Sequence, residues 1–114
     1  GVGIMTESKI QHAILHALNR RSDVRVFRNN VGTAVTQDGR FIRFGLQPGS
    51  ADLIGWKSVV ITNEDVGKKL AVFVSVEIKK PGGRVRPEQE NWMRNVIQAG
   101  GLAIISRDPS DITF

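Results

Sequence analysis

Residues 70–79, LAVFVSVEIK, constrain the fold more than any other segment, because their polarity alternates along the chain. Side chains of a β-strand point alternately to its two faces. One face of this predicted strand is aliphatic, with Val72, Val74, Val76 and Ile78. The other face carries Phe73, Ser75, Glu77 and Lys79. The strand therefore ends with a carboxylate and an ammonium group on the same face, spaced roughly 6–7 Å along the backbone.

The residues after this strand predict a turn, a helix and a further strand. Pro81-Gly82-Gly83 is typical of a turn, and Pro87 suits the first turn of a helix. One side of that helix is predicted to carry Gln89, Trp92, Met93 and Val96. Gly100-Gly101 ends the helix. Residues 102–106, LAIIS, then predict a last, fully buried strand.

The N-terminal half predicts one helix followed by strands. Thr6 is a candidate N-cap for a helix that runs to about residue 19, with a core-facing stripe of Ile10, Ile14 and Leu18. Residues 24–27 predict a strand, and Asp38-Gly39 suits the positive φ angles of a tight hairpin turn. Pro48-Gly49-Ser50 precedes a short strand over residues 52–56, and residues 58–69 read as a strand end and a polar loop.

Composition limits the class of protein. A chain of 114 residues is predicted to form one domain, spanning residues 5–114, and residues 1–4, which precede Met5, are predicted to be a vector remnant. The net charge of +5 is typical of a protein with an anionic partner, either nucleic acid or a membrane surface, but it is equally consistent with solubility alone. The absence of cysteine excludes disulfides and thiolate metal sites. A membrane-spanning helix needs about 20 consecutive apolar residues, and no apolar run in the sequence approaches that length. We therefore predict a cytoplasmic protein of a bacterial or phage-infected cell.

Asp52, Glu77 and Lys79 are the residues most suited to chemistry. If their strands pair near the ends, two carboxylates meet beside one ammonium group, and the carbonyl of Ile78 adds another oxygen. Mg²⁺ prefers oxygen ligands of this kind, together with a substrate phosphate, and Mn²⁺ is expected to substitute. Lys79 would then hold the attacking water or neutralise charge in the transition state.

Each of these residues also has a structural interpretation. A Glu-x-Lys pair on a strand is commonly a solvated ion pair that contributes little, and Asp52 after Pro-Gly-Ser is commonly a turn residue. Gln89 and Glu7 are equally consistent with the rim of an apolar stripe. Their joint occurrence on different elements of one small core favours a shared site.

The order Asp52, Glu77-x-Lys79, Gln89 resembles the PD-(D/E)xK nuclease superfamily, and most closely its virus-type replication-repair nuclease (VRR-NUC) domains. The similarity extends over RNNVG, RFGLQPGSADLIG, VEIKKPGGRVRPEQ and GGLAIISR, which together cover nearly the whole chain. The resemblance implies an α/β restriction-endonuclease-like core, with a central mixed sheet flanked by helices in the order α-β-β-β-α-β. It also implies Asp52 and Glu77 as metal ligands, Lys79 as catalytic base or charge stabiliser, and Gln89 as an orienting residue. Glu7 corresponds to an acid on the first helix of the superfamily.

Basic residues near these positions are candidates for DNA contacts. The loop after the acid–lysine pair supplies Lys80, Arg84 and Arg86, and its glycines allow a phosphate backbone to approach. The preceding hairpin arm adds Arg40 and Arg43. Few aromatic residues are available for base stacking, so contacts should be mainly to the DNA backbone and depend on its shape.

These observations predict a Mg²⁺-dependent DNA endonuclease. Resemblance to small stand-alone domains implies a homodimer that acts in DNA repair on branched DNA, such as Holliday junctions. One alternative is a non-catalytic basic module that binds nucleic acid within a replication or packaging complex, although it gives Asp52 no role. A sequence-specific restriction endonuclease is a further alternative, for which the chain offers no additional recognition segment.

Overall fold

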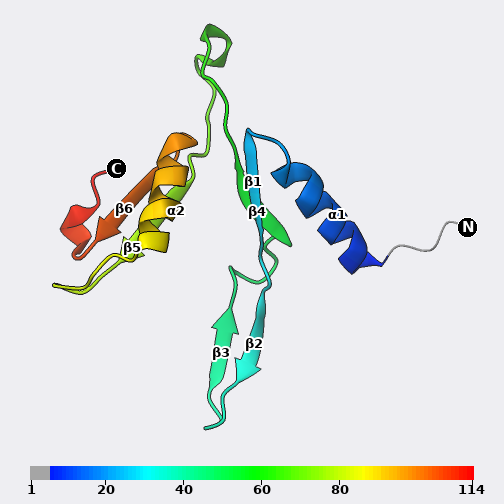
Figure 1. Cartoon of the computed structure of the whole chain (residues 1–114), viewed down its shortest axis with the longest axis vertical. Coiled ribbons are helices and arrows are strands. Elements are labelled where there is room, and N and C mark those ends of the chain that lie inside the picture. The colour runs from blue at the N-terminus through cyan, green and yellow to red at the C-terminus, as the bar shows by residue number, and fades with distance from the viewer. Residues whose placement is uncertain (1–5) are drawn as a thin grey trace, which may run out of the picture. The chain divides into compact units, whose positions relative to one another are not determined.

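A computed structural model describes residues 6–114, which fall into one compact unit ending at Lys57 and a second from Ser58 to Phe114 (Figure 1). The residues attributed to a vector remnant lie outside the described part. The order of helices and strands along the chain is α1, β1 to β5, α2 and β6. That residues 5–114 form a single domain stays a prediction.

Helix α1 spans Glu7–Asn19 and begins as predicted, since the Thr6 hydroxyl accepts a 3.2 Å hydrogen bond from the Lys9 N–H. The Asn19 amide joins the end of α1 to β1 through two hydrogen bonds with the backbone of Val26, of 2.9 and 3.0 Å. The predicted core-facing stripe is only partly covered, because Ile10 and Ile14 are each 45% exposed. The helix is attached through its C-terminal end, which leaves its earlier turns open.

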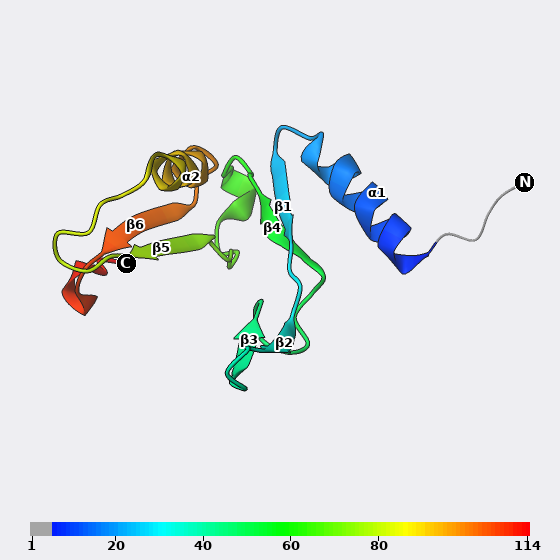
Figure 2. The ribbon, with the colours of Figure 1, turned by 60° about the horizontal axis from the view of Figure 1, so that its bottom comes forward.

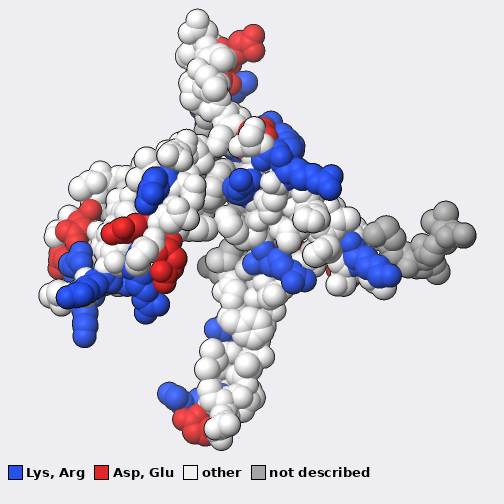
Figure 3. Space-filling view, viewed as in Figure 1, with Lys and Arg blue, Asp and Glu red and all other residues white. Residues whose placement is uncertain are grey.

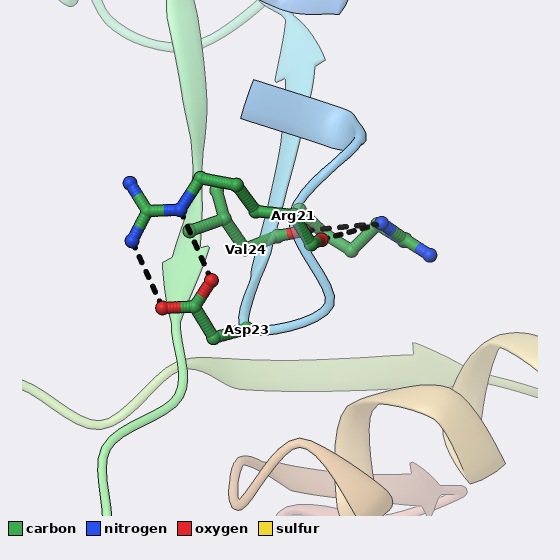
Figure 4. A network of polar contacts seen from close by, with 4 residues as sticks. Arg21, Asp23 and Val24 are labelled. Atoms are coloured by element: carbon green, nitrogen blue, oxygen red, sulfur yellow. Dashed lines mark hydrogen bonds and ion pairs between the residues drawn. The ribbon is translucent and has the colours of Figure 1, made fainter. Parts of the chain in front are cut away.

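A short turn leads from α1 into β1, and an ion pair fixes it (Figure 4). The Arg21 guanidinium donates two hydrogen bonds to the Asp23 carboxylate, of 3.1 and 2.9 Å. These bonds hold the pKa of Asp23 below its ordinary value. Val24, which follows at the start of β1, is buried.

The first unit contains two antiparallel strand pairs. β1 (Val24–Arg28) pairs with β4 (Leu53–Lys57), and β2 (Gly32–Val35) pairs with β3 (Phe41–Phe44). A Cβ on Gly55 would lie 1.8 Å from the carbonyl oxygen of Arg25, so only glycine allows this approach of β4 to β1. In the predicted hairpin turn, Gly39 alone has a positive φ, of 84°. The expectation that Asp38 shares that conformation is wrong, because a longer loop closed by Thr36 and Arg40 replaces the two-residue turn.

The second unit is a β-α-β arrangement. β5 (Val74–Ile78) pairs in parallel with β6 (Leu102–Ser106), and α2 (Pro87–Gln98) connects them and lies along one face of the pair (Figures 1 and 2). The Trp92 indole N–H donates a 2.8 Å hydrogen bond to the Ser75 hydroxyl, which fixes α2 over β5. Val96 of α2 is fully buried.

The predicted alternation of β5 is present, and it determines which face α2 covers. Ser75 and Glu77 lie half-buried beneath α2, whereas Val74, Val76 and Ile78 are 43, 38 and 78% exposed. The strand is shorter than the predicted segment 70–79. The expectation that β6 is fully buried is wrong, because α2 covers only one face of it and Ser106 alone among its residues is buried.

The described strands form three two-stranded sheets with both antiparallel and parallel pairing. The single central mixed sheet and the complete PD-(D/E)xK core order stay predictions. Residues 58–69 contain the 3₁₀ turn Asn63–Asp65 within a polar loop, and the strand end expected there is absent from this described segment.

Candidate functional site

The end of β5 brings an acid and a lysine together as the strand periodicity predicts. Glu77 and Lys79 lie on the face beneath α2, and the Lys79 Nζ atom is 3.4 Å from Glu77 Oε1. The Lys79 side chain is 15% exposed and that of Glu77 is 33% exposed. Partial burial reduces screening by water, so this ion pair is stronger than one on an open surface.

Gln89 on α2 contacts the same carboxylate oxygen. Its amide Nε2 donates a 2.6 Å hydrogen bond to Glu77 Oε1, while its own Oε1 accepts a 2.9 Å bond from the Arg86 N–H. The second bond satisfies a backbone donor at the start of α2 and fixes which end of the amide faces Glu77. Gln89 therefore couples the start of α2 to the acid on β5.

The backbone of β5 determines where the Ile78 carbonyl points. Two ladder bonds, from the Leu102 N–H to the Phe73 carbonyl (2.8 Å) and from the Lys79 N–H to the Ser106 carbonyl (3.1 Å), show that odd-numbered residues of β5 face β6. Successive residues of a strand direct their backbone groups to opposite edges. The Ile78 carbonyl is consequently directed to the edge of β5 away from β6.

A basic loop joins the end of β5 to α2. It opens with a turn closed by a 2.9 Å bond from the Gly83 N–H to the Lys80 carbonyl, and Gly82 has a φ of 77°, which glycine adopts without strain. The side chains of Lys80, Arg84 and Arg86 are exposed. Figure 3 shows basic side chains gathered at the end of this unit where the loop lies.

Asp52 lies in the first unit, directly before β4, and Asn29 organises the loop that leads to it. The Asn29 Nδ2 donates to the Ser50 hydroxyl (2.7 Å) and to the Ala51 carbonyl (2.9 Å), and its Oδ1 accepts from the Leu46 N–H (3.0 Å). The Asn29 N–H also donates to the Asp52 carbonyl at 2.8 Å. Asp52 itself is exposed.

Sequence reasoning assigned no role to Asn29, although it noted the RNNVG motif that contains it. A side-chain amide directly after a predicted strand can hydrogen-bond both donors and acceptors of a neighbouring loop. The position of Asn29 after the predicted strand was therefore the feature of the sequence that could have indicated its role. The loop to which Asn29 forms hydrogen bonds is set by the β1–β4 register, in which Arg28 pairs with Leu53.

The other predicted residues of the first unit are exposed and distributed over different elements. Glu7 lies in the first turn of α1, and Arg43 lies on β3 opposite Thr33. Arg40 pairs with Asp38 at 2.9 Å, and both side chains are largely exposed. A surface pair of this kind contributes little, so it leaves the Arg40 guanidinium available to an anion. The association of these residues, and of Asp52, with Glu77 stays a prediction.

The donor set at the end of β5 has the chemistry that a hard divalent cation requires. Lys79 and Gln89 both contact Oε1 of Glu77, so the remaining oxygen Oε2 and the Ile78 carbonyl are the oxygens that fit such an ion. Between residues 6 and 114, no three side chains of His, Cys, Asp and Glu cluster as a metal site. An ion held at this strand end by Glu77 would therefore need further oxygen ligands from the backbone, the substrate or water.

A small α/β protein with a carboxylate, a lysine and a glutamine gathered at a strand end, beside a basic loop, has the features of a nuclease domain. The VRR-NUC domain family model matches residues 5–107, so the chain belongs to the VRR-NUC family, and a nuclease-type function on DNA accompanies that membership. No curated protein and no solved structure matches the chain. None of the helices in residues 6–114 has the length and apolar character needed to span a membrane.

Proposed function

We propose that this protein is a Mg²⁺-dependent DNA endonuclease that hydrolyses phosphodiester bonds. The observation that carries the proposal is the Glu77–Lys79–Gln89 cluster, in which one carboxylate oxygen lies 3.4 Å from an ammonium and 2.6 Å from an amide donor. A structural ion pair alone does not account for a second, oriented donor from α2. VRR-NUC membership supports the same conclusion.

Each residue of the proposed site has a distinct task. Asp52, Glu77 and the Ile78 carbonyl are the proposed ligands, and a bound Mg²⁺ would polarise the phosphoryl oxygens of the substrate. Lys79 orients the attacking water and stabilises the negative charge that develops on the phosphoryl group. The attacking water forms the new P–O bond and releases one proton to the solvent, the old P–O bond breaks, and the leaving oxygen takes up a proton from the solvent. Gln89 keeps the Glu77 carboxylate in one orientation during this exchange.

DNA binding is proposed to depend on the phosphate backbone. The exposed charges of Lys80, Arg84 and Arg86 follow directly after the acid–lysine pair and suit contacts beside the scissile bond. Arg40 and Arg43 are proposed as further contacts. Recognition of phosphates without base contacts makes the shape of the DNA the basis of selection, which favours branched substrates such as four-way junctions.

We further propose that the protein acts as a homodimer, which would allow both opposing strands of a junction to be cut. The β2–β3 hairpin offers a surface for the second copy, because Val35 and Phe41, which lie opposite each other on the two strands, are 62 and 80% exposed. Sedimentation of the wild type and of Phe41→Ser tests this. A dimer weakened by the substitution is expected, and a wild-type monomer at all concentrations contradicts the proposal.

The nuclease assignment is tested with labelled four-way junction, flap and duplex DNA in Mg²⁺ or in EDTA. Cleavage that requires the metal, and that Glu77→Gln and Lys79→Ala abolish while DNA binding remains, is expected. Glu88→Gln is the matched control, since it removes an exposed carboxylate from the first turn of α2. Binding without cleavage of every substrate would establish the non-catalytic module instead.

The role of Asp52 is tested by metal binding. Asp52→Asn should weaken Mn²⁺ binding, measured by electron paramagnetic resonance, without lowering the melting temperature in the absence of metal. This follows because Asp52 is exposed and its hydrogen bond to Asn29 is made by the backbone carbonyl. A large loss of thermal stability would instead identify Asp52 as a structural turn residue.

A further inference from the structure

Arg107, the residue after β6, contacts the basic loop at its midpoint. Its Nη2 donates a 2.7 Å hydrogen bond to the Gly83 carbonyl, across 24 residues of sequence. The bond joins the end of one strand to the loop that leaves the neighbouring strand. We infer that Arg107 is a positioning residue, which holds residues 80–86 in the conformation that presents their positive charges to a phosphate backbone.

The loop benefits from such support because its other hydrogen bonds are confined to its first turn and its last residue. The turn from Lys80 to Gly83 closes the first part, and the Gln89 amide holds the Arg86 N–H at the start of α2. Arg84 and Val85, between these points, lie in a segment without helix or strand. The Arg107 bond falls directly before this segment and limits how far it moves from β6.

Gly83 is suited to receive this bond. A Cβ at this position would lie 3.0 Å from the Lys80 carbonyl oxygen and 3.6 Å from the Lys79 Cβ, so the loop backbone passes close to the end of β5. The Arg107 guanidinium therefore fixes a part of the loop that lies against Lys79, the residue that pairs with Glu77. A change in the loop at Gly83 would be transmitted to Lys79 and Lys80.

Arg107 is itself held by the turn that follows it. Its N–H donates a 2.8 Å bond to the Asp111 carboxylate, and the Asp108 N–H donates to the same oxygen at 3.2 Å. The Ser106 hydroxyl donates to the Asp108 carbonyl at 2.8 Å, while the Ser106 carbonyl accepts from Lys79. The guanidinium thus extends from a fixed backbone at the end of β6, which is what a positioning role requires.

The chemistry of arginine also suits a second contact. A guanidinium has five N–H donors in a planar fork, and the Gly83 carbonyl uses one nitrogen only. Because Arg107 is exposed, its remaining donors can reach a phosphate that the loop has bound. The inference rests on the proposed function only for this DNA contact, since the hold on the loop is independent of catalysis.

The sequence provides a direct assay of loop mobility. Trypsin does not cut before proline, and Lys80 and Arg86 are each followed by one, so Arg84–Val85 is the only susceptible bond within residues 80–86. Limited proteolysis of the full chain, followed by mass spectrometry, reports the opening of this loop. Cutting at Arg40–Phe41, in the exposed hairpin of the other unit, serves as the internal reference.

Arg107→Ala should accelerate the cut at Arg84–Val85 by about fivefold, as the loss of one hydrogen bond shifts a local opening equilibrium. The cut at Arg40–Phe41 should not change. Arg94→Ala removes an equal charge from the exposed surface of α2 and should leave both rates unchanged. Arg107→Lys keeps the charge but has a shorter side chain, so it should increase the rate of cleavage at Arg84–Val85 by a smaller factor. This variant replaces Arg107→Ala if the alanine variant fails to fold.

Binding of four-way junction DNA provides the second measurement. Arg107→Ala should weaken binding more than Arg94→Ala does, although both remove one charge. An unchanged rate at Arg84–Val85, or an equal rise at both tryptic sites, overturns the positioning role. Failure of the wild type to cut DNA in Mg²⁺ would refute the proposed endonuclease, while the proteolysis result would still decide the role of Arg107.

Discussion

Replacing Gln89 with glutamate tests the arrangement at the end of β5 most directly. The Gln89 Nε2 lies 2.6 Å from Glu77 Oε1, and its Oε1 lies 2.9 Å from the Arg86 nitrogen. A glutamate can still accept from the Arg86 N–H, but it places a second carboxylate where the amide donor stood. The capping role is therefore kept while the contact with Glu77 becomes repulsive.

The expected magnitude follows from the distance and the burial. Two unit charges about 4 Å apart repel by about 4 kcal/mol at an effective dielectric constant of about 20. Glu77 is 33% exposed, and the Lys79 ammonium lies 3.4 Å away, so water and the lysine offset much of this repulsion. A net destabilisation of about 1–2 kcal/mol at neutral pH remains.

The sign of the pH dependence distinguishes this repulsion from a simple packing loss. Acid removes the negative charges that repel, so the variant is most destabilised near neutral pH and regains stability as the pH falls. Gln89→Ala loses the hydrogen bond to Glu77, which contributes about 1 kcal/mol, but it adds no charge. Its loss of stability relative to the wild type should therefore depend less on pH.

Urea unfolding at about pH 7 and about pH 4, followed by tryptophan fluorescence, measures both effects. Asn91→Asp is the matched control, since it adds a carboxylate to an exposed position of α2 in the same part of the helix. If Gln89→Glu lowers the free energy of unfolding equally at both pH values, or if Asn91→Asp lowers it by the same amount, the direct contact between Gln89 and Glu77 would be refuted.

Three further predictions concern the loops around the candidate site. Asn29→Ala should release the loop before Asp52 and increase amide hydrogen exchange at Leu46 by about fivefold or more, since it removes the acceptor of that N–H; an unchanged exchange rate would contradict the organising role. Arg84→Ala should reduce the slope of log Kd against log salt by about one unit for any DNA sequence, measured by fluorescence anisotropy, and an unchanged slope would place the loop away from phosphates. Asp108 caps the short 3₁₀ turn Pro109–Asp111, and the Ser110 hydroxyl and N–H hold the pKa of its carboxyl group below the ordinary value. The stability that this cap contributes is therefore present above about pH 4 and is lost as pH falls through the lower folded pKa. Denaturation of Asp108→Asn across that range should lack this acid-dependent loss, and a curve parallel to the wild type would argue against the cap.

The helix boundaries and the acid–lysine pair were predictable because they depend on local rules. Thr6 caps α1 as its hydroxyl chemistry suggests, and Pro87 occupies the start of α2 as its fixed φ favours. Glu77 and Lys79 share a face because a strand has a period of two, irrespective of what packs on that face. The position of Gln89 within the first turn of α2 follows from Pro87 in the same way.

Burial was less predictable, because it depends on which elements meet. The exposed Ile10 and Ile14 have the spacing of a core-facing stripe, yet α1 is attached to β1 through Asn19 at its end. Likewise, the aliphatic composition of residues 102–106 indicated a fully buried strand, but only one face of β6 lies beneath α2. Periodicity identifies a face without identifying its partner.

The sequence by itself determined the family, the order of the main helices and strands, and the placement of a carboxylate and an ammonium at the end of one strand. These depend on residue type and on spacing within a few positions. Tertiary structure alone decided that the Gln89 amide donates to Glu77, that Asn29 organises the loop before Asp52, and that Arg107 holds the Gly83 carbonyl. Each of these contacts joins residues 12 or more positions apart, and such pairs meet only when strand register and helix docking bring their atoms within hydrogen-bonding distance.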